Sequence, residues 1–135
     1  MKDTTLERSI MSGIRQQLAI LGVTLWRRNT GALRSRYKGR DRFVRFGEPG
    51  AADLWGVGPE GRHWEIEVKR PGQRPTMKQA AFLMIMHQQG AVAFWVDSIE
   101  LAERVAVAIL DGGRVKWHED GDYDIEFDPE DDGLS

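Results

Sequence analysis

The sequence predicts one α/β domain in which a mixed β-sheet carries helices on its faces. Helical and strand patterns alternate along the chain, in the order helix, strands, helix, strand, helix. One strand, at residues 91–96, is apolar throughout, as expected at the centre of a covered sheet. A chain of 135 residues is long enough for one hydrophobic core. Together these observations indicate helices packed on the faces of a single sheet.

The first third of the chain predicts a helix followed by two short strands. Apolar residues recur at helical spacing between Leu6 and Leu21, and Gly22 is expected to end this helix. Two strands follow, with a turn and a basic loop between them. The expected bounds are 4–21 for the helix, 23–28 and 42–46 for the strands, 29–31 for the turn and 32–41 for the loop.

A strand pair and a second helix are expected in the middle of the chain. A hairpin turn at 58–61 joins the two strands, and a break at 71–75 that contains two prolines precedes the helix. Thr76 is the expected N-cap of this helix, and Gln79, three residues on, completes a capping box. The strands are expected at 53–57 and 63–70, and the helix at 76–89.

The last predicted elements are the apolar strand at 91–96, a helix and a short edge strand. Asp97 or Ser98 is expected to cap the helix, which extends to about Leu110, and the edge strand is expected at 114–117. The strand at 63–70, the middle helix and the apolar strand would form a right-handed crossover unit.

Basic and acidic residues are unevenly divided between two parts of the chain. The segment 119–135 holds nine acidic residues and no Lys or Arg, whereas 1–118 holds all 19 basic residues and 12 acidic ones. The formal balance of 1–118 is therefore +7, although the whole chain has a formal net charge of −2. We expect a folded domain at 1–118 with an anionic partner, most commonly nucleic acid. The acidic tail at 119–135 is expected to be flexible, or to lie back on this basic body.

Eight of the basic residues gather between Arg27 and Arg45, opposed only by Asp41. Because the guanidinium group matches the geometry of phosphate, this stretch is predicted to contact phosphates. A solvated, charged loop is the alternative.

The composition also excludes several classes of site. The chain has no cysteine, so disulfides, zinc–thiolate sites and thiol nucleophiles are ruled out. Because the sequence has no long apolar run and no signal-peptide pattern, we expect a soluble, intracellular protein without a membrane segment.

The pattern with the clearest chemistry lies on two neighbouring strands. Alternate side chains of an extended strand point the same way, so Glu65, Glu67 and Lys69 share one face. Asp53 begins the preceding strand, which the hairpin turn would bring alongside. Two or three carboxylates and an ammonium group would then meet, a set that suits Mg²⁺ or Mn²⁺ and metal-assisted hydrolysis of phosphodiesters. The alternative is an ordinary solvent-facing strand with alternating charges.

With these residues the sequence resembles the PD-(D/E)xK nuclease superfamily and, within it, the virus-type replication-repair nuclease (VRR-Nuc) family. The resemblance extends from about residue 5 to residue 105, and Ala52 stands where the family often has proline. It implies a restriction-endonuclease-like core, a central mixed β-sheet flanked by helices. It rests on Arg28-Asn29-Thr30-Gly31, Arg45-Phe46-Gly47, Gly50-Ala51-Ala52-Asp53-Leu54-Trp55-Gly56, Ile66-Glu67-Val68-Lys69-Arg70-Pro71-Gly72, and Thr76 with Gln79.

The resemblance implies roles for the residues that match the family motif. Asp53 would be the central metal ligand and Glu67 the second carboxylate ligand, and the Val68 carbonyl would complete the shell around Mg²⁺ or Mn²⁺. Lys69 would orient the attacking water or take its proton, and Gln79 would support that water or Lys69. Hydrolysis would leave a 5′-phosphate and a 3′-hydroxyl.

Other residues are expected near this site. Glu7 on the first helix would supply an outer carboxylate to the metal, with a plain surface residue as the alternative. For Glu65 a role in solvent is expected rather than ligation. The candidate contacts to nucleic acid are Arg28, Arg34, Arg36, Lys38, Arg45 and Arg70.

The aromatic and apolar residues favour structural roles. Four tryptophans in predicted strands are expected in the core, with stacking of Trp26 or Trp55 on a displaced base as the alternative. His63 is expected at the surface. The helical segment 80–86 is apolar beyond a single stripe, which favours contact with a second subunit. The four tryptophans are Trp26, Trp55, Trp64 and Trp95.

A domain of this size resembles the phage and bacterial members of the family. The predicted function is a metal-dependent endonuclease that cuts branched DNA, such as Holliday junctions, as a homodimer in the cytoplasm of a bacterial or phage-infected cell. A twofold dimer would supply the two active sites that symmetric cleavage needs. The alternatives are a nuclease for flaps or single strands, a catalytically silent nucleic-acid-binding module, and a purely structural protein.

Overall fold

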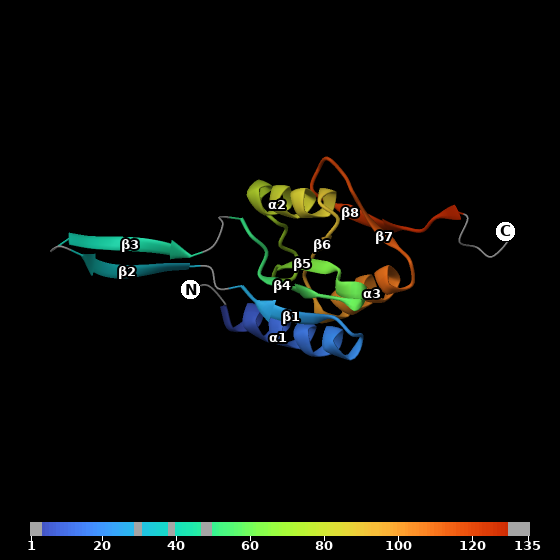
Figure 1. Cartoon of the computed structure of the whole chain (residues 1–135), viewed down its shortest axis with the longest axis horizontal. Helices are drawn as coiled ribbons and strands as arrows, with labels where there is room; N and C mark the ends of the chain where they lie inside the picture. The colour runs from blue at the N-terminus through green and yellow to red at the C-terminus, as the bar shows by residue number, and fades with distance from the viewer. Residues whose placement is uncertain (1–3, 29–30, 38–39, 47–49, 130–135) are drawn as a thin grey trace.

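The computed structural model describes residues 4–28, 31–37, 40–46 and 50–129, and for 31–37 and 40–46 it describes the backbone alone. Three helices, eight strands and one short 3₁₀ turn make up this part of the chain (Figure 1). The elements are α1 (Thr4–Ile20), β1 (Thr24–Arg27), β2 (Gly31–Tyr37), β3 (Arg40–Phe46), β4 (Leu54–Val57), the 3₁₀ turn (Pro59–Gly61), β5 (His63–Val68), α2 (Met77–Gln88), β6 (Val92–Val96), α3 (Ile99–Leu110), β7 (Arg114–Trp117) and β8 (Tyr123–Glu126).

A four-stranded mixed sheet with the order β1-β4-β5-β6 forms the centre of the molecule. β1, β4 and β5 pair antiparallel, whereas β5 and β6 pair parallel and are joined through α2. The parallel crossover unit expected from the sequence is therefore confirmed. In Figure 1, α2 lies above this sheet and α1 and α3 lie below it. The predicted α/β class with helices on both faces of the sheet is thus correct.

The two faces of β5 bury different kinds of side chain. Trp64, Ile66 and Val68 belong to the main hydrophobic core, which α1 and α3 cover. Glu65 and Glu67 alternate with them and are buried on the other face, toward α2. A small apolar cluster that includes Leu83 of α2 closes that second face. The period-two pattern thus separates an apolar layer from a buried acidic layer.

The helix caps follow the sequence closely. The Thr76 hydroxyl accepts from the Gln79 amide at 3.2 Å, and the Gln79 side chain accepts from the Thr76 amide at 2.9 Å. This is the predicted capping box. Of the two candidates for the cap of α3, Ser98 is the one used, since its hydroxyl accepts from the Leu101 amide at 3.1 Å.

The strand expected at 42–46 is present as part of β3, but the stretch expected as a basic loop at 32–41 forms β2 and the start of β3 instead. β2 and β3 pair along their whole length, from Gly31 opposite Phe46 to Tyr37 opposite Arg40. Figure 1 shows this pair, here called the basic arm (31–37 and 40–46), extending away from the central sheet. Apolar, aromatic and β-branched residues stand between the arginines of both segments, and strands tolerate this composition. The high density of charged residues hides this strand pattern in the sequence.

The acidic segment is also more ordered than expected. β8 pairs antiparallel with β7, and the Tyr123 hydroxyl donates to the Trp95 carbonyl at 2.6 Å. Glu126 pairs with Lys116 at 3.7 Å, and Asp128 pairs with Arg114. Of the two expected arrangements of the acidic segment, 119–129 follows the second and lies back on the basic body, because Glu126 and Asp128 find basic partners on β7. Residues 130–135 lie outside the described part.

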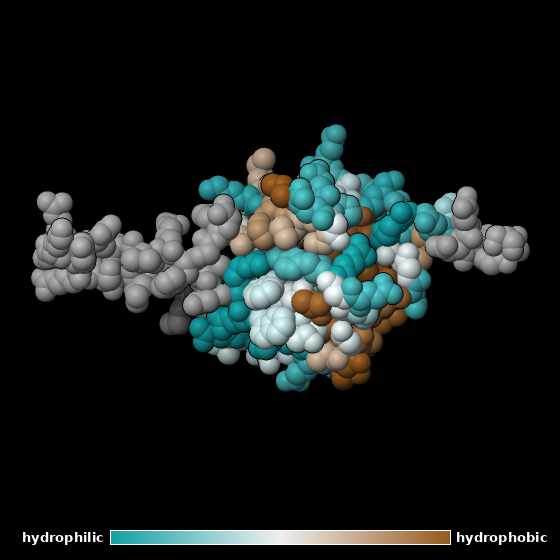
Figure 2. All heavy atoms as spheres, in the orientation of Figure 1, coloured by the Kyte–Doolittle hydropathy of each residue, from teal (hydrophilic) through white to brown (hydrophobic). Residues whose placement is uncertain are grey.

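Figure 2 shows hydrophobic side chains gathered over the end of α1 and over α3. Ile20, Val107 and Leu110 are exposed on these helices. Within the residues that the structure describes, no helix is long and apolar enough to cross a membrane.

Candidate active site

Two carboxylates meet where β4 begins and β5 ends. Asp53 directly precedes β4, and its backbone amide donates to Glu67 Oε1 at 3.2 Å. The Asp53 carboxylate in turn accepts from the Val68 amide, with 2.9 Å between Val68 N and Oδ2. The hairpin thus brings together residues that are 14 positions apart, as the alternation on the two strands predicts. Asp53 and Glu67 form the centre of the candidate site.

The pKa of Glu67 in this pair is unusual for a glutamate. Glu67 is only 2% exposed, and burial raises its pKa to about 9. The neighbouring charge of Asp53 is the second cause of this rise in pKa, whereas Lys69 acts in the opposite direction. Near neutral pH the pair therefore carries one proton more than two ordinary carboxylates would. Carboxylate oxygens are the donors that Mg²⁺ and Mn²⁺ prefer, so a divalent cation would fit here in place of that proton.

Lys69 completes the group from the end of β5. Its Nζ lies 4.0 Å from Glu67 Oε2 and donates to Gln79 Oε1 at 3.2 Å. Gln79 Oε1 is also the atom that accepts from the Thr76 amide in the capping box. The first turn of α2 therefore fixes the atom that holds the lysine. The structure brings together Asp53, Glu67, Lys69 and Gln79, all four of the expected catalytic residues.

Glu65 is not a solvent residue, which corrects the expectation from the sequence. It is 1% exposed, and its carboxylate forms a bidentate pair with Arg28, with O···N distances of 2.6 and 2.8 Å. His63 Nε2 lies 2.5 Å from the same carboxylate. A buried carboxylate needs such partners, because removing it from water is costly.

Arg28 is held by several partners within the fold, and its expected contact with nucleic acid stays a prediction. Besides Glu65, its guanidinium donates to the Ala52 carbonyl at 3.0 Å. Its backbone amide donates to the Asp53 carbonyl at 2.7 Å, and its guanidinium lies 5.5 Å from the centre of the Phe82 ring. Arg28 thus ties the segment that carries Asp53 to β5. The sequence places Glu65 on the correct face but gives no sign of its partner 37 residues earlier.

Glu7 is not joined to the two carboxylates. Its Oε1 lies 3.4 Å from Arg70 Nε, in a pair whose side chains are 41% and 37% exposed. No cluster of three or more acidic or histidine side chains suited to a metal occurs among residues 4–28 and 50–129, where side chains are described. The expected ligation by Glu7 and the phosphate contact by Arg70 therefore stay predictions, and here the two side chains pair with each other.

The remaining expected contacts lie on the basic arm. The structure describes only the backbone at Arg34, Arg36 and Arg45, and Lys38 lies outside the described residues. The three arginines are in β2 and β3, so they are carried on the arm that extends from the sheet.

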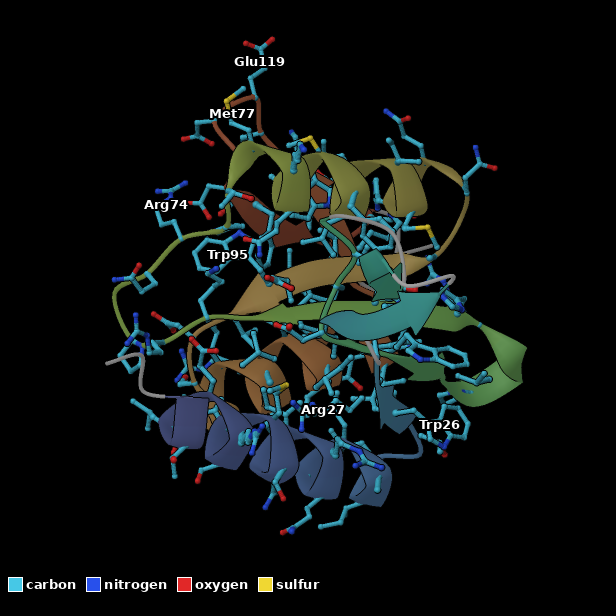
Figure 3. The ribbon with its side chains drawn as sticks, turned by 90° about the vertical axis from the view of Figure 1, so that its left-hand side faces the viewer. Trp26, Arg27, Arg74, Met77, Trp95 and Glu119 are labelled. Carbon is cyan, nitrogen blue, oxygen red and sulfur yellow. The ribbon has the colours of Figure 1, made fainter. Side chains whose placement is uncertain are left out.

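The tryptophans do not all belong to the core. Trp64 is buried, but Trp26 is 44% exposed on β1 and Trp55 is partly exposed on β4. Trp95 is partly covered by Arg74, whose guanidinium lies 5.8 Å from its ring centre (Figure 3). The apolar segment of α2 is likewise only partly buried: Ala80 and Leu83 are buried, whereas Ile85 is exposed.

The fold of the chain is similar to that of a solved structure. The chain matches a structure described as "VRR_NUC domain", with a TM-score of 0.52 over 74% of this chain and 92% of that one. The chain has the VRR_NUC fold. The two sequences are 23% identical, so the match concerns the fold. No protein-family model matches the sequence, and no curated protein matches it significantly.

The VRR_NUC fold confirms the architecture that the resemblance implied. The mixed sheet, the crossover through α2 and the two flanking layers of helices are all present. Within this fold Asp53, just before β4, lies beside Glu67 of β5, and Lys69, just after β5, contacts Gln79 of α2.

Proposed function

We propose that the protein is a metal-dependent nuclease that hydrolyses phosphodiester bonds of DNA at Asp53, Glu67 and Lys69. The observation that carries this proposal is the buried pair Asp53–Glu67, in which burial and the charge of Asp53 raise the pKa of Glu67 to about 9. Two adjacent carboxylates, with Lys69 4.0 Å from Glu67 as their cationic neighbour among the described side chains, form a site that suits a divalent ion. A structural neighbour described as a VRR_NUC domain supports the same reading.

The residues of the site have distinct tasks in this proposal. Asp53 and Glu67 would hold Mg²⁺ or Mn²⁺ through their oxygens. The Val68 amide donates to Asp53, and the Val68 carbonyl, which leaves an extended strand on the same side, would complete the ligand set. When bound, such an ion lowers the pKa of water and neutralises charge on the phosphate.

Lys69 would position the attacking water and hold its proton. The Nζ of Lys69 is fixed by Gln79 Oε1, so the lysine faces the two carboxylates rather than solvent. Attack by this water on phosphorus would release a 3′-hydroxyl and leave a 5′-phosphate. Gln79 acts through Lys69 and is a positioning residue.

The basic arm supports DNA as the substrate. β2 and β3 carry Arg34, Arg36, Arg40, Arg42 and Arg45, with Asp41 as their only acidic residue. A two-stranded ribbon is narrow enough to enter the major groove, and arginines suit phosphates on its flanks. We propose that the arm, with Lys38 between its strands, follows the duplex next to the cut, and that Arg70 contacts phosphate when Glu7 releases it.

We further propose that the protein cuts branched DNA, such as four-way junctions, as a homodimer in the cytoplasm of a bacterial or phage-infected cell. Paired symmetric cuts need two sites related by a twofold axis, and exposed Ile20, Val107 and Leu110 offer apolar surface for a second copy. Flaps or single strands are the alternative substrates.

The test is cleavage of a labelled panel that contains a four-way junction, a flap, a duplex and a single strand. Wild type would be compared with Asp53→Asn and Lys69→Ala, in Mg²⁺, in Mn²⁺ and in EDTA. Lys116→Ala is a matched control, because Lys116 is 58% exposed and pairs with Glu126 at the surface. We expect Lys69→Ala to lose about 10²–10⁴-fold in rate while it still binds DNA, and Lys116→Ala to cut normally.

Each outcome decides between the candidate functions. Paired nicks at the junction support the dimeric enzyme, and cleavage of the flap alone supports the replication-repair alternative. If wild type binds every substrate and cuts none in either metal, the protein is a binding module and the proposed catalysis is wrong.

A further inference from the structure

Three rings form a row across the central sheet beside the candidate site. The ring centres of Trp26 on β1 and Trp55 on β4 lie 5.3 Å apart at an interplanar angle of 38°. Trp55 and His63 on β5 follow at 6.2 Å and 26°, a stacked arrangement. Trp26 is 44% exposed and the side chain of His63 is 39% exposed. We call these three rings the aromatic platform.

The strand register places the platform on the same face as the carboxylates. Trp26 lies opposite Trp55, and Trp55 lies opposite Glu65, which shares its face of β5 with Glu67. Trp55 follows Asp53 by two residues, so the two side chains point the same way about 7 Å apart. That distance corresponds to about two steps of 3.4 Å along stacked DNA. A phosphate held at Asp53 would therefore have its neighbouring nucleotides at the platform.

Core packing does not account for these rings. β1 is the edge strand of the sheet, and Trp26 is exposed there (Figure 3). Next to the row on the same face lies the ion pair of Arg28 and Glu65, and the His63 ring also contacts the Glu65 carboxylate. Exposed aromatic rings of this kind bind the faces of bases, at sites whose cations attract the backbone.

The charge around the platform favours nucleic acid over a protein partner. The basic arm is inserted in the chain between β1, which carries Trp26, and β4, which carries Trp55. A strand that reaches Asp53 along the arm would pass this cationic side of the sheet.

We propose that the aromatic platform stacks unpaired bases of the DNA strand next to the phosphate that is cut. This inference rests on the proposed nuclease function and names the substrate feature that the site selects. Bases inside a blunt duplex are already stacked on their neighbours and cannot reach the rings. The platform therefore selects DNA with unpaired nucleotides at the cut, as in flaps, open junction centres and single strands.

The test measures binding in EDTA, where no cleavage occurs, to a single strand, a splayed duplex and a blunt duplex of equal length. The variants are Trp26→Ala, Trp26→Leu and Trp26→Phe. Phe127→Ala controls for loss of an exposed apolar side chain at a distance, since Phe127 is 51% exposed and directly follows β8. We expect Trp26→Ala and Trp26→Leu to weaken binding of the unpaired substrates about five-fold or more, with blunt-duplex binding unchanged. Trp26→Phe should keep most of the affinity, because phenylalanine retains a ring.

Two results would overturn the platform. One is equal weakening of all three substrates, and the other is unchanged binding in Trp26→Ala and Trp26→Leu while wild type binds and cuts DNA. A different result would overturn the nuclease function alone. In that case wild type would bind unpaired DNA, and this binding would depend on Trp26, but it would cut no substrate in Mg²⁺ or Mn²⁺. A wild type that binds none of the three substrates would overturn both proposals.

Discussion

Glu65 and Glu67 are two buried glutamates on one face of one strand, yet they have opposite surroundings. They are 1% and 2% exposed, so burial does not distinguish them. Glu65 has a bidentate arginine and a histidine on its carboxylate. Glu67 has the negative charge of Asp53 beside it and, among the described side chains, only Lys69, 4.0 Å away, as a cation.

The difference shows that the partner, rather than the burial, determines what each carboxylate does. Around Glu65 the charge is balanced by residues of the chain itself, and the balance holds Arg28 and the Asp53 segment in place. Around Glu67 the balance is incomplete, and a bound cation would complete it. The first glutamate therefore stabilises the fold, and we expect the second to serve the chemistry.

Exchanging each glutamate for glutamine should separate these two tasks most strongly. Glu65→Gln leaves the Arg28 guanidinium without its counter-charge, which we expect to lower the free energy of unfolding by about 3 kcal/mol. Glu67→Gln replaces a carboxyl that is already protonated at neutral pH, so its stability should change little while cleavage is lost. Urea denaturation in EDTA and cleavage in Mg²⁺, both near pH 7, measure the two effects.

The comparison predicts that one variant loses stability and keeps cleavage, whereas the other loses cleavage and keeps stability. Glu65→Gln, assayed at a temperature where it is folded, should still cut DNA, because Asp53, Glu67 and Lys69 are intact. A larger loss of stability in Glu67→Gln than in Glu65→Gln would show that the assignment of the two glutamates is reversed.

The pH dependence of stability should distinguish the glutamates next. In the metal-free folded protein Glu67 keeps its proton up to a pKa of about 9, whereas the unfolded chain loses it near the ordinary value of 4.5. The unfolded state therefore binds fewer protons between these values, and stability falls as pH rises, by up to about 1.4 kcal/mol per pH unit. Urea denaturation at pH 6, 7.5 and 9 in EDTA measures this slope.

Glu67→Gln is the matched control for the pH effect, because glutamine does not titrate. We expect its stability to fall less than that of wild type over the same range. Mg²⁺ should stabilise wild type more at pH 9 than at pH 6, since binding must displace the proton of Glu67. Parallel slopes for the two proteins would mean that Glu67 is ionised in the folded state.

The sequence was informative where the signal was local. Alternation on two strands predicted that Asp53, Glu67 and Lys69 meet, and the Thr76–Gln79 spacing predicted the capping box. The Arg28–Glu65 pair was missed because its partners are 37 residues apart and neither is marked by a periodic pattern. The strand at Tyr123–Glu126 was missed because its alternating acidic residues suggested a solvated tail, although its partners on β7 are basic.

The smallest expected effect tests whether the capping box serves the fold alone. Thr76→Ala and Gln79→Ala each remove one half of the box, so each should lower the free energy of unfolding by about 1 kcal/mol. Only Gln79→Ala also releases Lys69 Nζ, which Gln79 Oε1 holds at 3.2 Å. We therefore expect Gln79→Ala to lower kcat several-fold beyond Thr76→Ala, with KM for DNA unchanged in both. Equal kcat values in the two variants would mean that the first turn of α2 stabilises the helix and that Lys69 holds its position without it.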